Sequence, residues 1–374
     1  MNTIFDTLSI DRNEIKWEDY LFDLTPVEEV NGIFFKREDK FAPLGYGGIN
    51  GSKLRQCIWL TEQYVKTAKN PIGVISGTSV KSPQLPMGSA VAEHFGLKSI
   101  HVIGSTKADI AHKHENVNTA TWFGAEFYIN KHIAYNPVLQ RRVQDILSKD
   151  ERVKDYFYLE YGITVDHKVN SPERVERFHY VGSEQIKNIP EHITTLVIPA
   201  GSCNSCTSIL YGLARFRPKN LRDVYLIGIG PNKIDFIEER LDIIENVSGV
   251  YTKPFTRIYH DTPNKQQQYE SGLTSFFTDN TSDYNFNLHH YDLHTTNYVD
   301  YQEEMPYSYG GIEFHPTYEG KMMTYVNERM PNILGENTMV WIVGSKPRKE
   351  KMYDMLRGRL GEFPTHIKEF TYAE

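Results

Sequence analysis

Short apolar runs recur along the chain from about residue 55 onward, with helical stretches between them. The runs are rich in β-branched residues, they lack strict alternation of apolar and polar positions, and most are followed by Gly, Ser or Pro. Such runs are typical of strands that are buried on both faces of a parallel sheet. The predicted strands are residues 72–76, 99–103, 126–129, 195–199, 224–229 and 338–343.

The stretches between these runs have the length and the apolar spacing of amphipathic helices. Strands that alternate with helices predict the α/β class, with open parallel sheets and right-handed crossovers. The predicted helices are residues 53–66, 82–95, 114–123, 137–148, 205–216, 233–244, 320–328 and 348–359.

Two zones break this alternation. Residues 151–191 are polar, Tyr-rich and weakly periodic, so we expect them to form a crossing between two sub-domains. Residues 247–308 are the second irregular zone and hold three Lys or Arg against eight Asp or Glu. A long insert of this kind predicts a lid, a binding loop or an oligomer contact.

Composition narrows the class of protein. The chain has 374 residues, of which 40% are hydrophobic and 24% charged, as expected for about two folded domains. No apolar run reaches the roughly 18 residues of a membrane-spanning helix. The first thirty residues are acidic and show no signal-peptide pattern, so we expect a cytoplasmic protein. The net charge of −7 argues against a surface that coats DNA, although it leaves room for a local basic groove.

Neither the cysteines nor the histidines predict a metal site. Cys203 and Cys206 form a lone C-x-x-C, and the only other cysteine is Cys57. A structural zinc site needs four ligands, so we interpret the pair as small residues in a tight loop. The 247–308 zone contains four histidines, but the residues around the last three indicate a strand, on which their side chains would not converge. They are His260, His289, His290 and His294.

Lys53 has an unusual position in the sequence. It follows the small-residue loop GGINGS, which begins at Gly47, and it lies at the predicted start of a helix. Glycines let the backbone approach a ligand closely, and a helix N-terminus disfavours a protonated amine. Both features suit a lysine that forms a Schiff base as a neutral amine. The simpler alternative is a surface lysine after a loop.

A second loop lies between the strand at 195–199 and the helix at 205–216. A strand, a small-residue loop and a helix N-terminus together can bind a phosphate through backbone N–H groups. The alternative is an ordinary β-to-α turn, because neither common nucleotide-binding fingerprint fits this loop. Its residues are Gly201, Ser202, Cys203, Asn204 and Ser205.

Two further turns carry candidate residues. Ser82-Pro83 predicts a helix cap, and the preceding Thr78-Ser79 lies where a carboxylate could bind. The motif HPTYEGK at residues 315–321 places a Tyr-Glu pair before another helix, which could equally be a surface turn.

Taken in chain order, these motifs resemble those of pyridoxal 5′-phosphate (PLP)-dependent enzymes of fold type II, the tryptophan-synthase-β-like group. Within that group they are most similar to the D-cysteine desulfhydrase and 1-aminocyclopropane-1-carboxylate (ACC) deaminase branch. Its motifs LTPIEPL, KRED, GGNKxRK, NLLLDRLLGA, GSGGT and DPVYEGKSM resemble residues 24–28, 36–39, 47–56, 116–125, 201–205 and 315–322, respectively.

The resemblance implies a role for each candidate residue. Lys53 corresponds to the lysine that binds PLP as a Schiff base and later acts as a base. Residues 201–205 correspond to the phosphate loop, and Ser82 to a catalytic serine that contacts the substrate or acts near the Cα proton. Tyr318 corresponds to the active-site tyrosine of the branch, and Glu319 to the acidic residue that faces the ring nitrogen.

The resemblance implies that Gln84, beside Ser82, binds the substrate together with Thr78 and Ser79, whose loop position suits a carboxylate, and that the cofactor lies in a cleft between two domains. It implies a large PLP-binding domain from residues 1–55 and 160–374, a small α/β domain from residues 56–159, and a homodimer. Residues 247–308 are then expected to form an irregular insert within the large domain.

The chain also departs from the branch at substrate-facing positions. Pro83 replaces an Asn that usually faces the phenolic oxygen of the cofactor, and Gly51-Ser52 separates Asn50 from Lys53. The TGG motif near the C-terminus reads Val-Gly-Ser at residues 343–345. The resemblance therefore supports the identity of the cofactor more strongly than that of the substrate.

The resemblance predicts a PLP-dependent lyase or deaminase that acts at Cα or Cβ of an amino acid. One alternative keeps the cofactor and changes the substrate: a decarboxylase or lyase for an amino acid joined to a nucleobase, as in viral DNA hypermodification. A second alternative is a non-catalytic binding protein on the same fold.

Overall fold

The computed structural model describes residues 20–45, 48–104, 107–130, 136–230, 234–261, 284–300, 303–346, 348–360 and 362–371. These residues form two compact units, each built on a β-sheet. In the described part of the chain, the first unit comprises residues 20–21, 41–166 and 348–371, and the second comprises 22–40 and 167–346.

The first unit contains a five-stranded sheet in the order β14-β5-β4-β3-β6, with parallel neighbours throughout. Its strands are β3 (Gly73–Gly77), β4 (Lys98–Gly104), β5 (Glu126–Asn130), β6 (Phe157–Tyr158) and β14 (Lys368–Glu369). Its helices are α2 (Ser52–Thr67), α3 (Gln84–His94), α4 (Ala108–Ala111), α5 (Glu115–Trp122), α6 (Asn136–Lys149) and α12 (Lys349–Leu360).

Apolar side chains pack against both faces of this sheet. Leu139 and Val143 of α6 join the cluster that includes Ile75 of β3. Leu85 of α3 and Val117 of α5 belong to a separate cluster, which contains Ile103 and Phe127 of the sheet. Burial on both faces explains why these strands read as continuous apolar runs.

The second unit contains a seven-stranded sheet in the order β1-β2-β13-β7-β8-β10-β9, in which only the β1–β2 pairing is antiparallel. Its strands are β1 (Val27–Val30), β2 (Ile33–Arg37), β7 (Thr195–Ala200), β8 (Asp223–Gly228), β9 (Phe255–Tyr259), β10 (Phe286–Asp292) and β13 (Thr338–Ile342). A separate hairpin pairs β11 (Ser308–Tyr309) with β12 (Ile312–Glu313).

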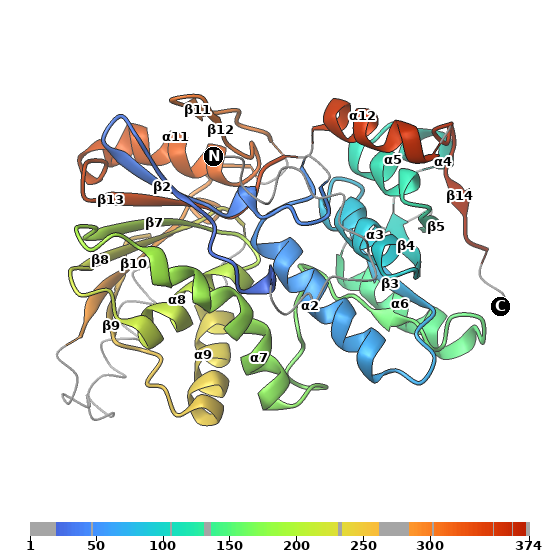
Figure 1. Ribbon diagram of the computed structural model, residues 1–374, viewed down its shortest axis with the longest axis horizontal. Coiled ribbons are helices and arrows are strands. Elements are labelled where there is room, and N and C mark those ends of the chain that lie inside the picture. Colours follow the sequence, from blue (N-terminus) through green and yellow to red (C-terminus); the bar gives the residue numbers. More distant parts are fainter. Residues whose placement is uncertain are drawn as a thin grey trace. The chain divides into compact units, whose positions relative to one another are not determined.

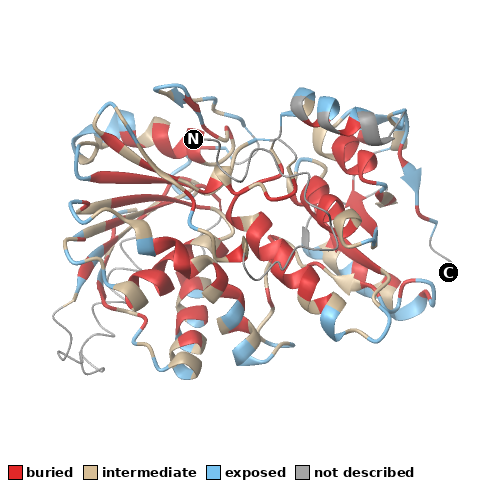
Figure 2. Ribbon diagram, in the orientation of Figure 1, coloured by how far each residue is buried: buried red, intermediate tan, exposed pale blue. Residues whose placement is uncertain are grey.

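Helices cover the two faces of the seven-stranded sheet. Figure 1 shows α7, α8 and α9 on one face and α11 on the other. β13, the third strand in the order of this sheet, is buried along its whole length (Figure 2). The helices are α7 (Pro172–Ser183), α8 (Asn204–Phe216), α9 (Ile234–Ser248) and α11 (Glu319–Arg329), and the 3-10 turns are η2 (Glu38–Lys40), η3 (Glu184–Asn188) and η4 (Pro331–Ile333).

The structure confirms the α/β class and the predicted elements. Each predicted strand overlaps one of β3, β4, β5, β7, β8 and β13, and each predicted helix overlaps one of α2, α3, α5, α6, α8, α9, α11 and α12. Lys233, the predicted start of the helix now labelled α9, lies outside the described residues.

Both zones that we expected to be irregular contain regular elements. Helix α7 lies within 151–191, and Ser171 caps it by accepting a hydrogen bond from the Arg174 N–H. Strands β9 and β10 lie within 247–308, so this zone is part of the main sheet and not only an insert. Residues 262–283 of the zone lie outside the described residues.

The division into units also differs from the expected domains. Described residues that were expected in the large domain group instead with the five-stranded sheet: 20–21, 41–45, 48–55, 160–166 and 348–371. The reason is local contact: α2 packs on α3, α12 packs on α5, and β14 pairs with β5.

Candidate active site

The carboxyl ends of three neighbouring strands gather candidate residues in the second unit. β2, β13 and β7 are parallel, so the residues that follow them emerge at one edge of the sheet. These residues are Glu38-Asp39 after β2, Val343-Gly344 after β13 and Gly201 after β7. Open α/β sheets bind ligands at such an edge.

Glu319 lies at this edge, in the first turn of α11. Its side chain is completely buried, and its Oε1 accepts hydrogen bonds from the N–H groups of Val343 at 2.8 Å and Gly344 at 3.3 Å. Its second carboxylate oxygen, Oε2, has no hydrogen-bond partner among the described residues. Burial raises the pKa of Glu319 to about 8, against the lowering effect of the backbone N–H groups, and the nearby charge of Asp39 adds to the rise.

The raised pKa of Glu319 predicts how the stability of the apoenzyme varies with pH. The folded state binds this proton up to about pH 8, whereas an unfolded chain releases it near the ordinary value of 4.5. The free energy of unfolding should therefore fall as the pH rises from about 5 to about 8. Thermal denaturation of apoenzyme across this range should show that fall, and Glu319→Gln should flatten it. An equal slope in the variant would assign the pH dependence to other groups.

The loop at 201–205 joins β7 to α8. Cys203 is the N-cap residue of α8 and has a left-handed backbone, with φ of 65° and ψ of 3°. No side chain caps the first turn of α8, so its backbone N–H groups are the donors that the helix start offers to an anion. A Cβ on Gly201 would lie 3.4 Å from the Tyr318 ring, so Tyr318 approaches the start of this loop closely.

A buried pair of polar side chains is hydrogen-bonded to this loop at Asn204. His179 of α7 is fully buried, and its Nδ1 lies 3.1 Å from the Ser208 hydroxyl of α8. That hydroxyl donates to the Asn204 carbonyl, and burial lowers the pKa of His179 to about 3, so the ring is neutral. His179 was not predicted, although the cap signal Ser171-Pro172 marks the start of its helix.

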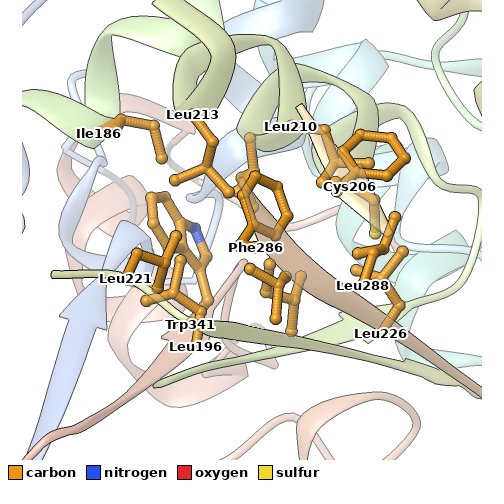
Figure 3. Packing of buried hydrophobic residues seen from close by; sticks show 14 of the residues in the cluster. Ile186, Leu196, Cys206, Leu210, Leu213, Leu221, Leu226, Phe286, Leu288 and Trp341 are labelled. Atoms are coloured by element: carbon orange, nitrogen blue, oxygen red, sulfur yellow. The ribbon is translucent and has the colours of Figure 1, made fainter. Parts of the chain in front are cut away.

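The two cysteines of the C-x-x-C are buried, free thiols. The Cys206 Sγ donates to the Pro199 carbonyl, and the Cys203 Sγ donates to the Gly201 carbonyl. A hydrogen bond that the protonated thiol makes to Cys203, together with burial, raises the pKa of Cys206 well above its usual range. Figure 3 shows Cys206 among the apolar side chains under α8. Both thiols pack as small residues, as their sequence context predicts.

Lys53 belongs to the first unit, in the first turn of α2. Gly51 caps this helix with φ of 90°, a conformation that favours glycine, and its N–H donates to the Phe41 carbonyl. Lys53 is half-buried, next to the buried Ser52 and Leu54. A lysine at a helix N-terminus after a glycine turn is therefore present as expected, although Gly47 lies outside the described residues.

Thr78, Ser79 and Ser82 form the turn between β3 and α3. Thr78 is completely buried, and its hydroxyl has no hydrogen-bond partner among the described residues. Ser79 and Ser82 are half-buried, and the Ser82 hydroxyl accepts the Gln84 N–H at 3.3 Å. α3 begins at Gln84, one residue after the start that a Ser82 cap predicts. The hydroxyl of Thr78 offers a buried donor to a ligand.

The side-chain amide of Gln84 is hydrogen-bonded to backbone groups of the protein. Its Nε2 donates to the carbonyls of Leu159 and Glu160, and its Oε1 accepts the Gly162 N–H at 2.9 Å. The amide is thus engaged with the backbone that follows β6. These bonds assign Gln84 a part in holding the 159–162 segment, and its substrate-binding role stays a prediction.

Gln84→Ala should therefore destabilise the first unit. It leaves buried backbone groups of residues 159–162 without partners, which costs about 1–3 kcal/mol for an unsatisfied group. Ser82→Ala is a matched control in the same turn, because its 3.3 Å contact is long and half-exposed. Urea denaturation should give a clearly lower midpoint for Gln84→Ala than for Ser82→Ala. Equal midpoints would show that the Gln84 amide does not stabilise the segment.

His260 and His289 of the 247–308 zone belong to a group of stacked aromatic rings. The His260 ring lies 4.2 Å from the Tyr291 ring, the His289 ring lies 4.4 Å from the Tyr225 ring, and the His289 Nε2 lies 3.0 Å from an Asp223 oxygen. His290 points to the opposite face of β10 and is buried, whereas His294 lies in the turn after it. In the described part of the chain, no group of three or more His, Cys, Asp or Glu could hold a metal ion.

The chain resembles proteins of known chemistry over most of its length. It is 47% identical over 378 residues to the O-seryl-dTMP PLP-dependent decarboxylase of Salmonella phage ViI, covering 94% of this chain and 88% of that protein. No protein-family profile matches the chain. Within the described residues, no helix has the length and apolar character needed to cross a bilayer.

Solved structures show the same fold. An ACC deaminase homologue matches with a TM-score of 0.60 at 16% identity, covering 91% of this chain and 94% of that chain. Apo diaminopropionate ammonia lyase of Escherichia coli matches with a TM-score of 0.50 at 12% identity, covering 97% of both chains. The architecture is that of PLP-dependent enzymes of fold type II. The chain belongs to the family of PLP-dependent enzymes that includes the phage decarboxylase.

The residues present fit PLP. The orphaned Oε2 of Glu319 lacks only a donor such as a protonated ring nitrogen, and the start of α8 offers backbone N–H groups to a phosphate. Gly201 leaves room beside Tyr318 that a larger residue would fill. The PLP-dependent relative confirms PLP as the cofactor that the sequence predicts. We propose the role of each residue below.

Proposed function

We propose that this enzyme decarboxylates an amino acid that is joined through its side chain to a pyrimidine nucleotide. The observation that carries the proposal is the 47% identity to the phage protein, whose name gives O-seryl-dTMP as its substrate. The ACC deaminase homologue shares only 16% identity, so it supports the fold and not elimination or deamination of a free amino acid. The nucleobase-linked alternative is thus better supported than the lyase or deaminase reaction that the sequence motifs first predict.

The overall reaction balances without an oxidant or reductant. The bond between Cα and the carboxyl carbon breaks, its electron pair stays on Cα, carbon dioxide leaves, and one proton is added at Cα. A seryl group attached through its oxygen becomes a 2-aminoethoxy group. PLP, when bound, supplies the electron sink that accepts the pair from Cα.

We assign the cofactor-binding roles to four features. Lys53 binds the cofactor through its amine, and the Gly201–Ser205 loop binds the phosphate mainly through backbone N–H groups. Glu319, negatively charged and hydrogen-bonded through Oε1 to Val343 and Gly344, presents Oε2 to a protonated ring nitrogen. A cation at that position favours the ionised carboxylate, which opposes the effect of burial on its pKa.

The remaining candidates act on the substrate. We assign Tyr318 the role of holding or moving a proton, because its ring lies close to the start of the phosphate loop and its neighbour in the chain is Glu319. Thr78, Ser79 and Ser82 provide hydroxyl and backbone donors to the amino-acid part of the substrate. These donors are neutral, so they bind a carboxylate without the ion pair that would stabilise its charge against loss as carbon dioxide.

The phosphate-loop assignment predicts how two variants differ. Ser205→Ala leaves the backbone donors in place, so it should weaken PLP binding by at most about 1–3 kcal/mol, the range for one hydrogen bond to a charged group. Asn204→Pro removes an N–H and conflicts with the left-handed backbone of Cys203, so it should weaken binding more. Dialysis followed by PLP quantification compares them, and equal retention would place the phosphate elsewhere.

A comparison of substrates tests the proposed function itself. Holoenzyme is incubated separately with O-seryl-dTMP, free serine and D-cysteine, and the products are identified by mass spectrometry. We expect loss of carbon dioxide from O-seryl-dTMP and no turnover of the free amino acids. Release of ammonia and a keto acid from a free amino acid would instead support a deaminase.

A further inference from the structure

The turn that precedes α11 is organised by one residue, His315. The His315 carbonyl accepts the N–H groups of Tyr318 at 3.1 Å and Gly320 at 2.9 Å. Its side chain also takes part, because Nδ1 accepts the Thr317 N–H at 3.2 Å. The backbone that presents Tyr318 and Glu319 is thus fixed by three acceptor contacts to His315.

The side-chain contact of His315 does not by itself require histidine. A side-chain acceptor that bonds to the N–H two residues later is the arrangement that Asn and Asp form in an Asx turn. Asp occupies this position in the motif DPVYEGKSM that residues 315–322 resemble. Histidine therefore keeps the turn and adds an aromatic ring, whose proton, in the neutral form, lies on Nε2.

The added ring contacts Tyr318. The two ring centroids lie 4.8 Å apart at an interplanar angle of 52°, within the range of favourable tilted aromatic pairs. Tyr318 also lies close to Gly201, where a Cβ would be 3.4 Å from the ring. The Tyr318 ring thus packs against the turn at 315–320 and lies close to the first residue of the phosphate loop.

We infer that His315 is a positioning residue, whose ring sets the orientation of Tyr318 against Gly201 and so adjusts the phosphate loop. The inference rests on the proposed function only in treating residues 201–205 as that loop. His315 has two separable effects: the Nδ1 contact stabilises the turn, and the ring contact acts on cofactor binding through Tyr318.

Two reciprocal variants separate the effects. His315→Asn keeps an acceptor for the Thr317 N–H and removes the ring, whereas His315→Phe keeps a ring and removes the acceptor. We expect His315→Asn to melt close to the wild type but to bind PLP about 2- to 10-fold more weakly, the range for one lost aromatic pair. We expect His315→Phe to melt at a lower temperature but, while folded, to bind PLP nearly as the wild type does.

A double-mutant cycle tests whether His315 acts through Tyr318. PLP dissociation constants are measured by titration of the apoenzyme for the wild type, His315→Asn, Tyr318→Ala and the double variant. If the ring acts through Tyr318, His315→Asn should cause no further loss in the Tyr318→Ala background. Unchanged PLP affinity in His315→Asn, or an equal loss in both backgrounds, would overturn the inference.

These readouts do not depend on the substrate. If the enzyme fails to decarboxylate O-seryl-dTMP but the cycle shows coupling, the proposed function fails and the role of His315 stands. If decarboxylation is observed and the coupling is absent, the role of His315 fails alone.

Discussion

Lys53→Ala should abolish turnover, by more than about 10³-fold, while the protein remains folded. The reason is that the amine of Lys53 is proposed to hold the cofactor covalently, and alanine offers no nucleophile. Lys53 is half-buried on the first turn of α2, so its loss removes no extensive packing. Circular dichroism should be unchanged, and PLP should be removed by dialysis from the variant but not from the wild type.

Borohydride trapping identifies the lysine directly. Reduction of wild-type holoenzyme followed by peptide mapping should place the pyridoxyl group on Lys53. Two other lysines are already engaged: Lys36 donates to the Thr25 carbonyl and the Asn188 side chain, and Lys321 donates to the Asp300 carbonyl. Labelling of Lys36, Lys81 or Lys321 in place of Lys53 would contradict the assignment.

Glu319→Gln should retain the cofactor and slow turnover by about 10²–10³-fold, comparable to the loss of one preorganised electrostatic group. The variant keeps the shape of the side chain and a hydrogen-bond acceptor for Val343 and Gly344. It removes the negative charge that would stabilise a protonated ring nitrogen. Steady-state kinetics and the cofactor absorbance spectrum should both change.

Glu313→Gln is a matched control for the charge. Glu313 lies on β12 in an exposed position outside the candidate site, so this variant should retain the wild-type kcat and spectrum. If Glu319 served only to favour the start of α11, its replacement would cost about 0.3–1 kcal/mol of stability and leave kcat unchanged. That result would remove Glu319 from the proposed mechanism.

The sequence predicted best those helices and strands whose apolar pattern can be recognised within the element itself. The central strands β7 and β13 are buried on both faces, so their apolar runs are continuous and recognisable. A strand was indicated around His289 and His290 but was not placed in the main sheet, because Asn287, His289 and Tyr291 on its less buried face interrupt the apolar pattern. β9 was missed because a short edge strand needs few apolar residues.

The sequence predicted which residues belong to the candidate site, but not which groups they contact. The loop at 201–205 and the Tyr318-Glu319 pair were found because small residues or a motif marked them. The partners of Glu319, the backbone of residues 343–344, are supplied by the parallel pairing of β13 with its neighbours. The backbone partners of Gln84 were not predicted for the same reason, because they lie more than seventy residues away in the chain.

The most direct test of the proposed function follows the fate of the Cα carbon. Holoenzyme is incubated with O-seryl-dTMP in deuterium oxide, and the nucleotide product and the released gas are analysed by mass spectrometry. We expect a 2-aminoethoxy product with one deuterium on the former Cα, one equivalent of carbon dioxide, and no ammonia. A product that keeps its carboxyl group, or ammonia released with a keto acid, would contradict decarboxylation.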